Sequence, residues 1–171
     1  MSPLHGTLAL FRGFFTESAL RSATLVKGLG LPFRPGPRER VLLVGQFAEF
    51  LNQGRRRFPR ADTLEFDYTP FYTSRPEDRS RIRRQAAAYD RVVFCLANYN
   101  SLEVLEELAA LAPRLLVLST LSPVYLSRVP WVRTAVAVYG TSPASFAAGF
   151  AVLAGDFRAE GRLPVELAPA P

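Results

Sequence analysis

The chain has 171 residues, a length typical of one domain, and 49% of them are hydrophobic against 21% charged, which excludes a disordered chain. The formal net charge is +6, and every basic residue except Lys27 is arginine. No stretch reaches the roughly 20 apolar residues that a membrane helix needs, and no signal-peptide pattern opens the sequence. We therefore expect a cytoplasmic chain with no membrane partner.

Short β-branched runs alternate with longer amphipathic segments from Ala23 onward, which is typical of βα units around a mostly parallel sheet. Residues 1–17 read as a linker or lead-in helix, residues 18–167 as one domain and residues 168–171 as a tail. The expected strands are Ala23–Lys27, Arg40–Gly45, Thr63–Asp67, Arg91–Leu96, Arg114–Ser119 and Thr134–Val138. The expected helices are Thr16–Ser22, Phe47–Arg57, Pro76–Tyr89, Ser101–Leu111 and Pro143–Leu153.

The runs around Val41, Val92 and Leu115 are apolar almost throughout, as in strands that helices cover on both faces. We expect these three strands to be central, buried and parallel neighbours. The sequence thus predicts an α/β fold, a three-layer α/β/α sandwich with a mostly parallel sheet of about six strands.

Polar side chains follow several of the expected strands, and the carboxyl ends of parallel strands meet at one edge of a sheet. The candidate substrate-binding or domain-interface residues are Asn98, Tyr99, Asn100, Ser122, Tyr125, Tyr139 and Thr141. Hydroxyl and amide groups match sugar hydroxyls, and aromatic rings cover their CH faces. The structural alternative is that Asn98, Asn100, Ser122 and Ser142 cap helices or make turns.

The sequence lacks the residue patterns that nucleotide binding, nucleophilic catalysis and zinc binding require. The turn after Gly45 has no three-glycine pattern, and no Walker loop precedes Lys27, so nucleotide binding is disfavoured. His5 is the only histidine, and Cys95 lies in an apolar run, which leaves no nucleophile with a base and no zinc ligand set. We expect no catalytic residue, no metal and no cofactor.

Arginine clusters could bind phosphate or an acidic polymer, but solvated helical faces are the favoured reading. The clusters are Arg55–Arg57 and the series Arg79, Arg81, Arg83 and Arg84. No aromatic residues are interleaved with them, so we expect no nucleic-acid partner.

Two segments carry a family resemblance. Arg21–Lys27 followed by Leu31 and Pro32 resembles the beginning of the C-terminal domain of glycoside hydrolase family 3. The second segment is similar to the end of that domain, and it comprises Ser122–Leu126, Val129 with Pro130, Ala137–Gly140, Gly155 and Gly161–Val165. Within the family, the bacterial beta-N-acetylglucosaminidases are the branch that the chain resembles. Gly28 stands where the family usually has asparagine, and Asp156 where glutamate is more common.

The resemblance implies that the catalytic residues of the family belong to another domain. In the family, an upstream barrel carries the catalytic aspartate, and a barrel needs about 250 residues. Members that act on glucosides take a general-acid glutamate from the loop that corresponds to Ala97–Asn100, where this chain has no carboxylate before Glu103. The N-acetylglucosaminidase branch keeps both catalytic functions on the barrel.

The chain is therefore expected to be a non-catalytic C-terminal domain that supports glycosidic-bond hydrolysis by a barrel domain, with that barrel and a saccharide as partners. The alternative is a stand-alone carbohydrate-binding or scaffold protein with the same fold.

Overall fold

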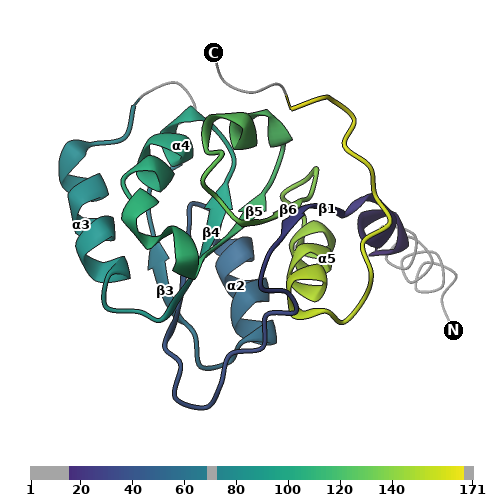
Figure 1. Cartoon of the computed structure of the whole chain (residues 1–171), viewed down its shortest axis with the longest axis horizontal. Helices are drawn as coiled ribbons and strands as arrows, with labels where there is room; N and C mark the ends of the chain where they lie inside the picture. Colours follow the sequence, from purple (N-terminus) through teal and green to yellow (C-terminus); the bar gives the residue numbers. More distant parts are fainter. Residues whose placement is uncertain (1–15, 69–72, 168–171) are drawn as a thin grey trace, which may run out of the picture.

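A computed structural model describes residues 16–68 and 73–167 of the chain. It contains one six-stranded sheet of order β1-β6-β5-β4-β2-β3, in which only the β1–β6 pair is antiparallel. The strands are β1 (Thr24–Gly28), β2 (Val41–Gly45), β3 (Asp62–Glu65), β4 (Arg91–Leu96), β5 (Leu115–Ser119) and β6 (Thr134–Ala137). The helices are α2 (Ala48–Arg57), α3 (Pro76–Ala86), α4 (Tyr99–Glu106) and α5 (Pro143–Ala154), with 3-10 helices η1 (Ala109–Arg114) and η2 (Pro123–Arg128). Residues 16–22 form a further short helix (Figure 1).

The predicted centre of the sheet is confirmed. Strands β2, β4 and β5 are parallel neighbours, with Leu43 opposite Val93 and Val93 opposite Leu116. Every residue of β2 and β5 is buried, as is every residue of β4 after Arg91. Apolar side chains on both faces of these strands account for this position, because neither face can meet water without cost.

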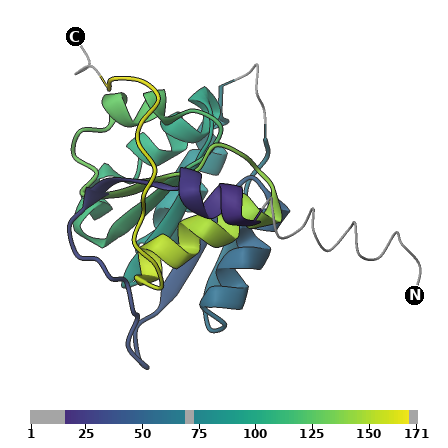
Figure 2. The same cartoon turned by 90° about the vertical axis from the view of Figure 1, so that its right-hand side faces the viewer.

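Helices cover both faces of the sheet, so the predicted three-layer α/β architecture is confirmed. Helices α2 and α5 pack on one face through an aromatic cluster that includes Phe50, Phe146 and Phe150. Helices α3 and α4 pack on the other face, where Ile82 and Leu102 are fully buried or nearly so. Figure 2 shows α2 and α5 lying together on one side of the strands.

Two helical glycines allow the first layer to approach closely. A Cβ atom on Gly54 of α2 would lie 2.5 Å from Leu43 Cδ1, and one on Gly149 of α5 would lie 2.2 Å from Leu118 Cδ1. Both distances are well below van der Waals contact. Alanine at either position would push its helix away from the sheet.

Residues 156–167, which we call the strap, pass over the edge of the sheet that β1 forms. Phe157 of the strap packs in the core on the α2–α5 side, whereas Leu167 packs on the opposite face. Between them, the Gly161 N–H donates to the Ala23 carbonyl at 3.1 Å. The strap, drawn in yellow in Figures 1 and 2, therefore binds both layers together and covers an otherwise open edge strand.

Several predicted boundaries were wrong by a few residues. The fourth predicted helix starts at Tyr99 rather than Ser101 and gives way after Glu106 to η1 instead of continuing to Leu111. Pro113 cannot donate a helical hydrogen bond, which favours the short 3-10 turn. The third predicted helix ends at Ala86 because the Ala88 and Tyr89 N–H groups bond three residues back. Residues 1–15 of the predicted lead-in over residues 1–17, with His5, and the predicted tail at residues 168–171 lie outside the described residues.

Candidate functional site

The strand order places a topological switch point between β2 and β4. The chain leaves β2 toward β3 on one side, returns through α3 to β4 on the other side, and continues to β5 and β6. In doubly wound sheets, the crevice outside the carboxyl ends at such a point is the usual ligand site. The residues that follow β2 and β4 are therefore the first place to search for function.

Three side-chain amides at this point are buried and incompletely paired. Gln46 follows β2, and within residues 16–68 and 73–167 neither its buried Nε2 nor its buried Oε1 atom has a hydrogen-bond partner. Asn98 Nδ2 and Asn100 Oδ1, which follow β4, are likewise buried without a hydrogen-bond partner among the described residues. All three side chains belong to residues no more than 8% exposed. A buried polar group without a partner costs about 1–3 kcal/mol, so this concentration of such groups indicates a site that another molecule completes.

The sheet register relates Gln46 to its surroundings. Gly45 pairs with Glu65, so the next residues along the two parallel strands, Gln46 and Phe66, lie side by side. The Phe66 N–H donates to the Gly45 carbonyl at 3.3 Å, which continues the ladder to this level. Because side chains alternate along a strand, Gln46 faces the same side as Val44 and Phe66, toward α3 and α4.

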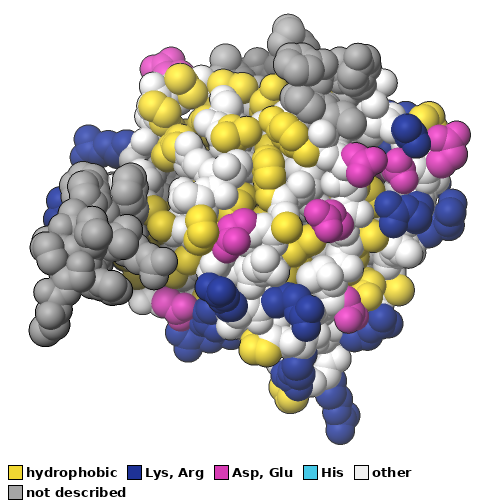
Figure 3. All heavy atoms as spheres, turned by 180° about the vertical axis from the view of Figure 1, so that it is seen from behind, with side chains coloured by type: hydrophobic (Ala, Val, Ile, Leu, Met, Phe, Trp, Pro, Cys, Tyr) yellow, Lys and Arg dark blue, Asp and Glu magenta, His cyan; other side chains and the backbone are white. Residues whose placement is uncertain are grey.

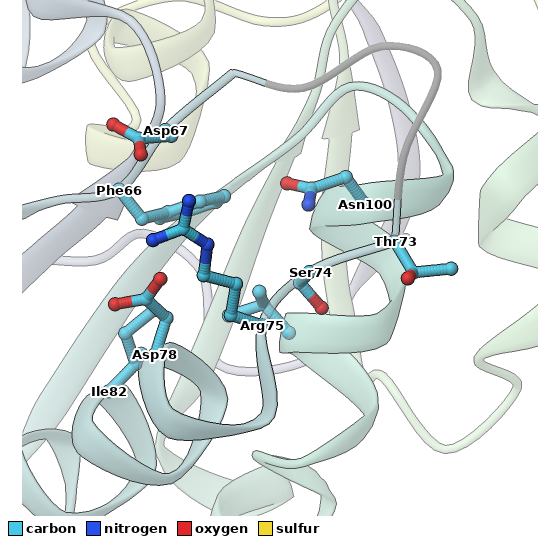
Figure 4. Close-up of a pocket in the computed structure, with 9 residues that line it drawn as sticks. Phe66, Asp67, Thr73, Ser74, Arg75, Asp78, Ile82 and Asn100 are labelled. Atoms are coloured by element: carbon cyan, nitrogen blue, oxygen red, sulfur yellow. The ribbon is translucent and has the colours of Figure 1, made fainter.

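A cavity of about 250 Å³ opens beside Phe66 on that face. Its walls combine apolar and polar groups, and they comprise Phe66, Asp67, Thr73, Ser74, Arg75, Asp78, Ile82, Asn100 and Val104. Figure 4 shows the Asn100 amide pointing into this space from α4, opposite Asp67 and Arg75. Of the predicted site residues, Asn100 is thus the one that lines a cavity and carries an unpaired buried atom.

Glu103, the first carboxylate after β4, is engaged in structural contacts. Its Oε2 accepts hydrogen bonds from the Ser74 N–H at 2.8 Å and the Ser74 hydroxyl at 2.9 Å. It also lies 3.4 Å from Arg79 Nη1 in an ion pair whose two side chains are 15% and 23% exposed. Glu103 therefore ties α4 to the beginning of α3.

Three predicted polar residues cap helices, as the structural alternative proposed. Asn98 Oδ1 accepts from the Ser101 N–H at 2.9 Å, and the Ser101 hydroxyl in turn accepts from the Asn98 N–H, which completes a capping box. Ser122 accepts from the Val124 N–H at the start of η2, and Ser142 accepts from the Ser145 N–H at the start of α5. These oxygens are occupied by local structure.

Thr120 joins the loops after β4, β5 and β6. Its N–H donates to the Leu96 carbonyl at 2.8 Å, and its hydroxyl donates to the Gly140 carbonyl at 2.7 Å. The three loops predicted to share one edge of the sheet are therefore bonded side by side. Thr120 itself was not among the predicted site residues.

The remaining predicted site residues divide into free and engaged side chains. Tyr99 is 50% exposed, and Thr141 is exposed as well. By contrast, the Tyr139 hydroxyl lies 2.9 Å from Thr24 Oγ1 and is directed to β1, while Tyr125 is partly buried against the core on the α3–α4 side. Of these four residues, only Tyr99 and Thr141 present exposed side chains at this edge.

Four of the seven exposed large hydrophobic side chains of the described residues lie at the same edge, and the other three, Leu25, Leu29 and Val165, belong to β1, the loop after it and the strap. Tyr68, Tyr99, Leu121 and Val124 follow the carboxyl ends of β3, β4 and β5, and each is 42–50% exposed. Leu121 has φ 64°, a left-handed conformation that costs a leucine about 1 kcal/mol or more. Backbone strain of this kind is typical of binding sites. The sequence analysis missed both Gln46 and Leu121, although a polar residue directly after the apolar β2 was a usable signal.

The described residues also show the state of the cysteine, the arrangement of possible metal ligands and the length of the apolar helices. Burial raises the pKa of the Cys95 thiol far above its usual range, so the reactive thiolate is disfavoured. Within residues 16–68 and 73–167, no group of three His, Cys, Asp or Glu side chains is placed to hold a metal ion. No helix in those residues has the length and apolarity required to cross a membrane.

No protein-family model matches the sequence, and neither does any curated protein. Solved structures do match. A glycoside hydrolase family 3 beta-N-acetylglucosaminidase from Paenibacillus sp. str. FPU-7 superposes with a TM-score of 0.72 at 23% identity, over 91% of this chain and 32% of that chain. The fold is that of a domain found within glycoside hydrolase family 3 enzymes. The predicted resemblance is confirmed at the level of the fold.

Two further enzymes share this family 3 fold. A fungal multi-domain family 3 beta-N-acetylglucosaminidase matches with a TM-score of 0.68 at 21% identity, over 90% of this chain and 19% of that chain. A family 3 beta-glucosidase from Bifidobacterium adolescentis matches with a TM-score of 0.66 at 14% identity, over 85% and 27%. The chain therefore spans between about a fifth and a third of the enzymes that it matches, as expected for a C-terminal domain of this family.

Proposed function

We propose that this chain is the non-catalytic C-terminal α/β domain of a glycoside hydrolase family 3 enzyme of the beta-N-acetylglucosaminidase or beta-glucosidase kind. Its role is to support glycosidic-bond hydrolysis by a barrel domain. The observation that carries the proposal is the match over nearly the whole of this chain but only a minor part of each enzyme. Glycosidase chemistry needs two carboxyl groups across the scissile bond, and Glu103, nearest to the expected position, is already bound to Ser74 and Arg79.

The carboxyl edge of the sheet is the face that we propose meets the barrel. Its exposed side chains include Tyr68, Tyr99, Leu121 and Val124, which are apolar or aromatic as in the core of a protein interface, beside polar ones such as Thr141. The unpaired amide atoms of Gln46, Asn98 and Asn100 add hydrogen-bonding groups that a partner could satisfy. Among the predicted interface residues, Tyr99 and Thr141 are best placed for direct contact, while Ser122, Tyr125 and Tyr139 support the loops.

An activity assay tests the catalytic part of the proposal. The purified chain should not hydrolyse 4-nitrophenyl N-acetyl-β-glucosaminide or 4-nitrophenyl β-glucoside above the rate of a mock preparation from cells that lack the chain, carried through the same purification. Turnover that disappears in Glu103→Gln would overturn the proposal, because it would assign the acid to this chain.

A binding assay tests the docking part. Amide chemical shifts of the chain should change at Tyr99, Leu121 and Thr141 when a family 3 beta-N-acetylglucosaminidase barrel is added. Tyr99→Ala and Leu121→Ala should weaken the complex, whereas Arg84→Ala on α3 should not. Unchanged shifts at the carboxyl edge in the presence of the barrel would contradict this docking face.

The buried unpaired amides also favour a second candidate, a stand-alone carbohydrate-binding protein. Neutral donors and acceptors on Gln46, Asn98 and Asn100 suit saccharide hydroxyls. Titration with N-acetylglucosamine oligomers separates the two candidates, since direct saccharide binding at Asn100 without a barrel would favour the second. We keep the cytoplasm as the proposed location, where a free buried cysteine such as Cys95 is common.

A further inference from the structure

The amino edge of the sheet, opposite the proposed docking face, carries a groove of about 530 Å³. It lies between the loop before β2 and the end of α2. Arg34, Arg57 and Arg60 contribute to its walls, together with Glu39 and Asp156. The cavity beside Pro59 continues this surface to Arg55 and Arg56.

The two arginine clusters of the sequence differ in how their charges are balanced. On α3, Arg79 and Arg83 pair with Glu107, and Arg81 pairs with Asp78, at 3.5–3.9 Å. At the groove and the cavity that adjoins it, four exposed arginines have no carboxylate within ion-pair distance in the described residues, namely Arg34, Arg55, Arg56 and Arg60. Three of the four α3 arginines are thus paired, with Arg84 as the exception, whereas Arg57 is the one arginine at the groove that has a carboxylate partner among the described residues.

The acidic residues of the groove do not cancel the charge of the four unpaired arginines. The Asp156 carboxylate accepts hydrogen bonds from Arg57 Nε and Arg57 Nη2, both at 2.7 Å, and Glu39 Oε1 lies 3.4 Å from Arg91 Nη2. Each carboxylate is therefore matched by an arginine outside the unpaired set. The carboxyl end of α2 cancels little of the positive charge, because a helix terminus carries only about half a negative charge.

Backbone contacts hold two of the unpaired arginines at the groove. Arg34 Nε donates to the Ala154 carbonyl at 3.3 Å, and Arg60 Nη1 donates to the Pro37 carbonyl at 2.8 Å. Arg60 Nη2 also donates to the Gly36 carbonyl at 3.5 Å, and the remaining N–H groups of both guanidinium ions make no hydrogen bond within residues 16–68 and 73–167. A guanidinium that is held in place and retains free donors is suited to bidentate binding of phosphate oxygens.

Figure 3 shows many Lys and Arg side chains gathered toward the lower end of the molecule, and hydrophobic side chains toward the upper end. The lower end is where the loop between β1 and β2 lies in Figure 1. Among the described residues, the exposed aromatic side chains Tyr68 and Tyr99 follow the carboxyl ends of the strands, away from the groove. The groove thus lacks a stacking platform for nucleic-acid bases.

We propose that the Arg34–Arg57–Arg60 groove binds a small ligand that carries two or more phosphate groups. A concave wall of guanidinium ions fits a compact polyanion better than the flat surface of a membrane or the length of a nucleic acid. This site is separate from the docking face and does not depend on the proposed function.

The test uses inorganic pyrophosphate as the probe, with binding to the full chain measured by calorimetry at low ionic strength. We expect a Kd of about 1 mM or tighter, and about tenfold weaker binding for Arg34→Gln/Arg60→Gln, which removes the fixed charge-assisted donors. Arg55→Gln/Arg56→Gln should weaken binding about two- to fivefold through the lost long-range charge. Because neither Arg55 nor Arg56 has a carboxylate partner, that variant remains informative if the first one folds poorly.

The matched control is Arg83→Gln/Arg84→Gln on α3, which removes the same net charge and should change the Kd less than twofold. Equal weakening by all three variants would overturn the proposal, because it would mean attraction by net charge alone. No measurable heat with pyrophosphate would overturn it as well. Vesicles containing phosphatidylglycerol distinguish a lipid phosphate from a free one, and binding to vesicles but not to pyrophosphate would contradict a small-ligand groove.

Discussion

The two ends of the sheet differ in the kind of unsatisfied group that they present. At the carboxyl edge, Gln46, Asn98 and Asn100 hold neutral amide atoms that are buried without partners among the described residues, and apolar side chains such as Leu121 and Val124 are exposed there. At the amino edge, exposed arginines lack carboxylate partners, but their guanidinium groups remain in water. The first kind of group costs folding free energy, and the second kind costs almost nothing.

This difference indicates how each edge is used. A buried amide that lacks a partner is tolerated where another molecule completes its hydrogen bonds, so the carboxyl edge is an incomplete interface. Hydrated arginines need no partner for folding, and they act through long-range attraction and bidentate contacts. Docking and anion binding can therefore occupy opposite ends of one small domain without competing.

The largest expected effect comes from breaking the core that holds both edges. Val93 is fully buried at the centre of β4, and Val93→Asp should abolish soluble expression because the charge would have no partner. The matched control is Val124→Asp at the carboxyl edge, where valine is 45% exposed, and it should remain soluble and folded. Solubility and circular dichroism measure both outcomes. A folded Val93→Asp protein would contradict the central position of β4.

The next effect separates structure from chemistry at the carboxyl edge. Glu103→Ala should lower the free energy of unfolding by about 1–3 kcal/mol, because it leaves the Ser74 N–H and hydroxyl without their acceptor. Urea denaturation measures this loss in the free energy of unfolding. Glu106→Ala, an exposed change on the same helix, should alter stability by no more than about 0.5 kcal/mol. Equal effects of the two changes would mean that Glu103 does not tie α4 to α3.

The regular part of this fold could be predicted from the sequence because it follows from periodicity. Unbroken apolar runs at β2, β4 and β5 have few other stable placements than the centre of a covered sheet. The position of Asn98 as a helix cap was also within reach, since asparagine before a helix is a common signal. Neither conclusion needed contacts between distant residues.

The features that define the site depend on such contacts. No local pattern shows that Glu103 reaches Ser74, 29 residues away, or that Gln46 lies beside Phe66 with both amide atoms unpaired. The left-handed conformation of Leu121 was equally hidden, because leucine is not a residue that favours it. Likewise, the arginine clusters look alike in sequence, and only the positions of the carboxylates show that Arg79, Arg81 and Arg83 are paired while Arg55 and Arg56 have no carboxylate partner in the described residues.

A smaller effect sharpens the role of the two asparagines. Asn98→Ala should cost about 1 kcal/mol because it removes the cap on the Ser101 N–H. Asn100→Ala should change stability by less than about 0.5 kcal/mol, since the Oδ1 atom of this side chain accepts no hydrogen bond from the described residues. Urea denaturation of both variants provides the comparison. If Asn100→Ala is the more destabilising change, then Asn100 has a structural role and is not reserved for a partner.

The smallest expected effect concerns Asp156 at the amino edge. The hydrogen-bonded Arg57 guanidinium holds the pKa of this carboxyl below its ordinary value of 3.8, and the charge of Arg34 adds to the effect. Because the pKa is lower in the folded chain than in the unfolded one, the stabilisation is present above about pH 4 and disappears as the pH falls through the folded value.

A carbon-13 titration of the Asp156 carboxyl should give a pKa below 3.8 in the native chain. Arg57→Gln should raise that pKa toward 3.8 and Arg34→Gln should raise it less, whereas Arg55→Gln, which contacts no carboxylate, should leave it nearly unchanged. A larger rise with Arg34→Gln than with Arg57→Gln would mean that Asp156 responds to the general field of the groove and not to its bidentate partner.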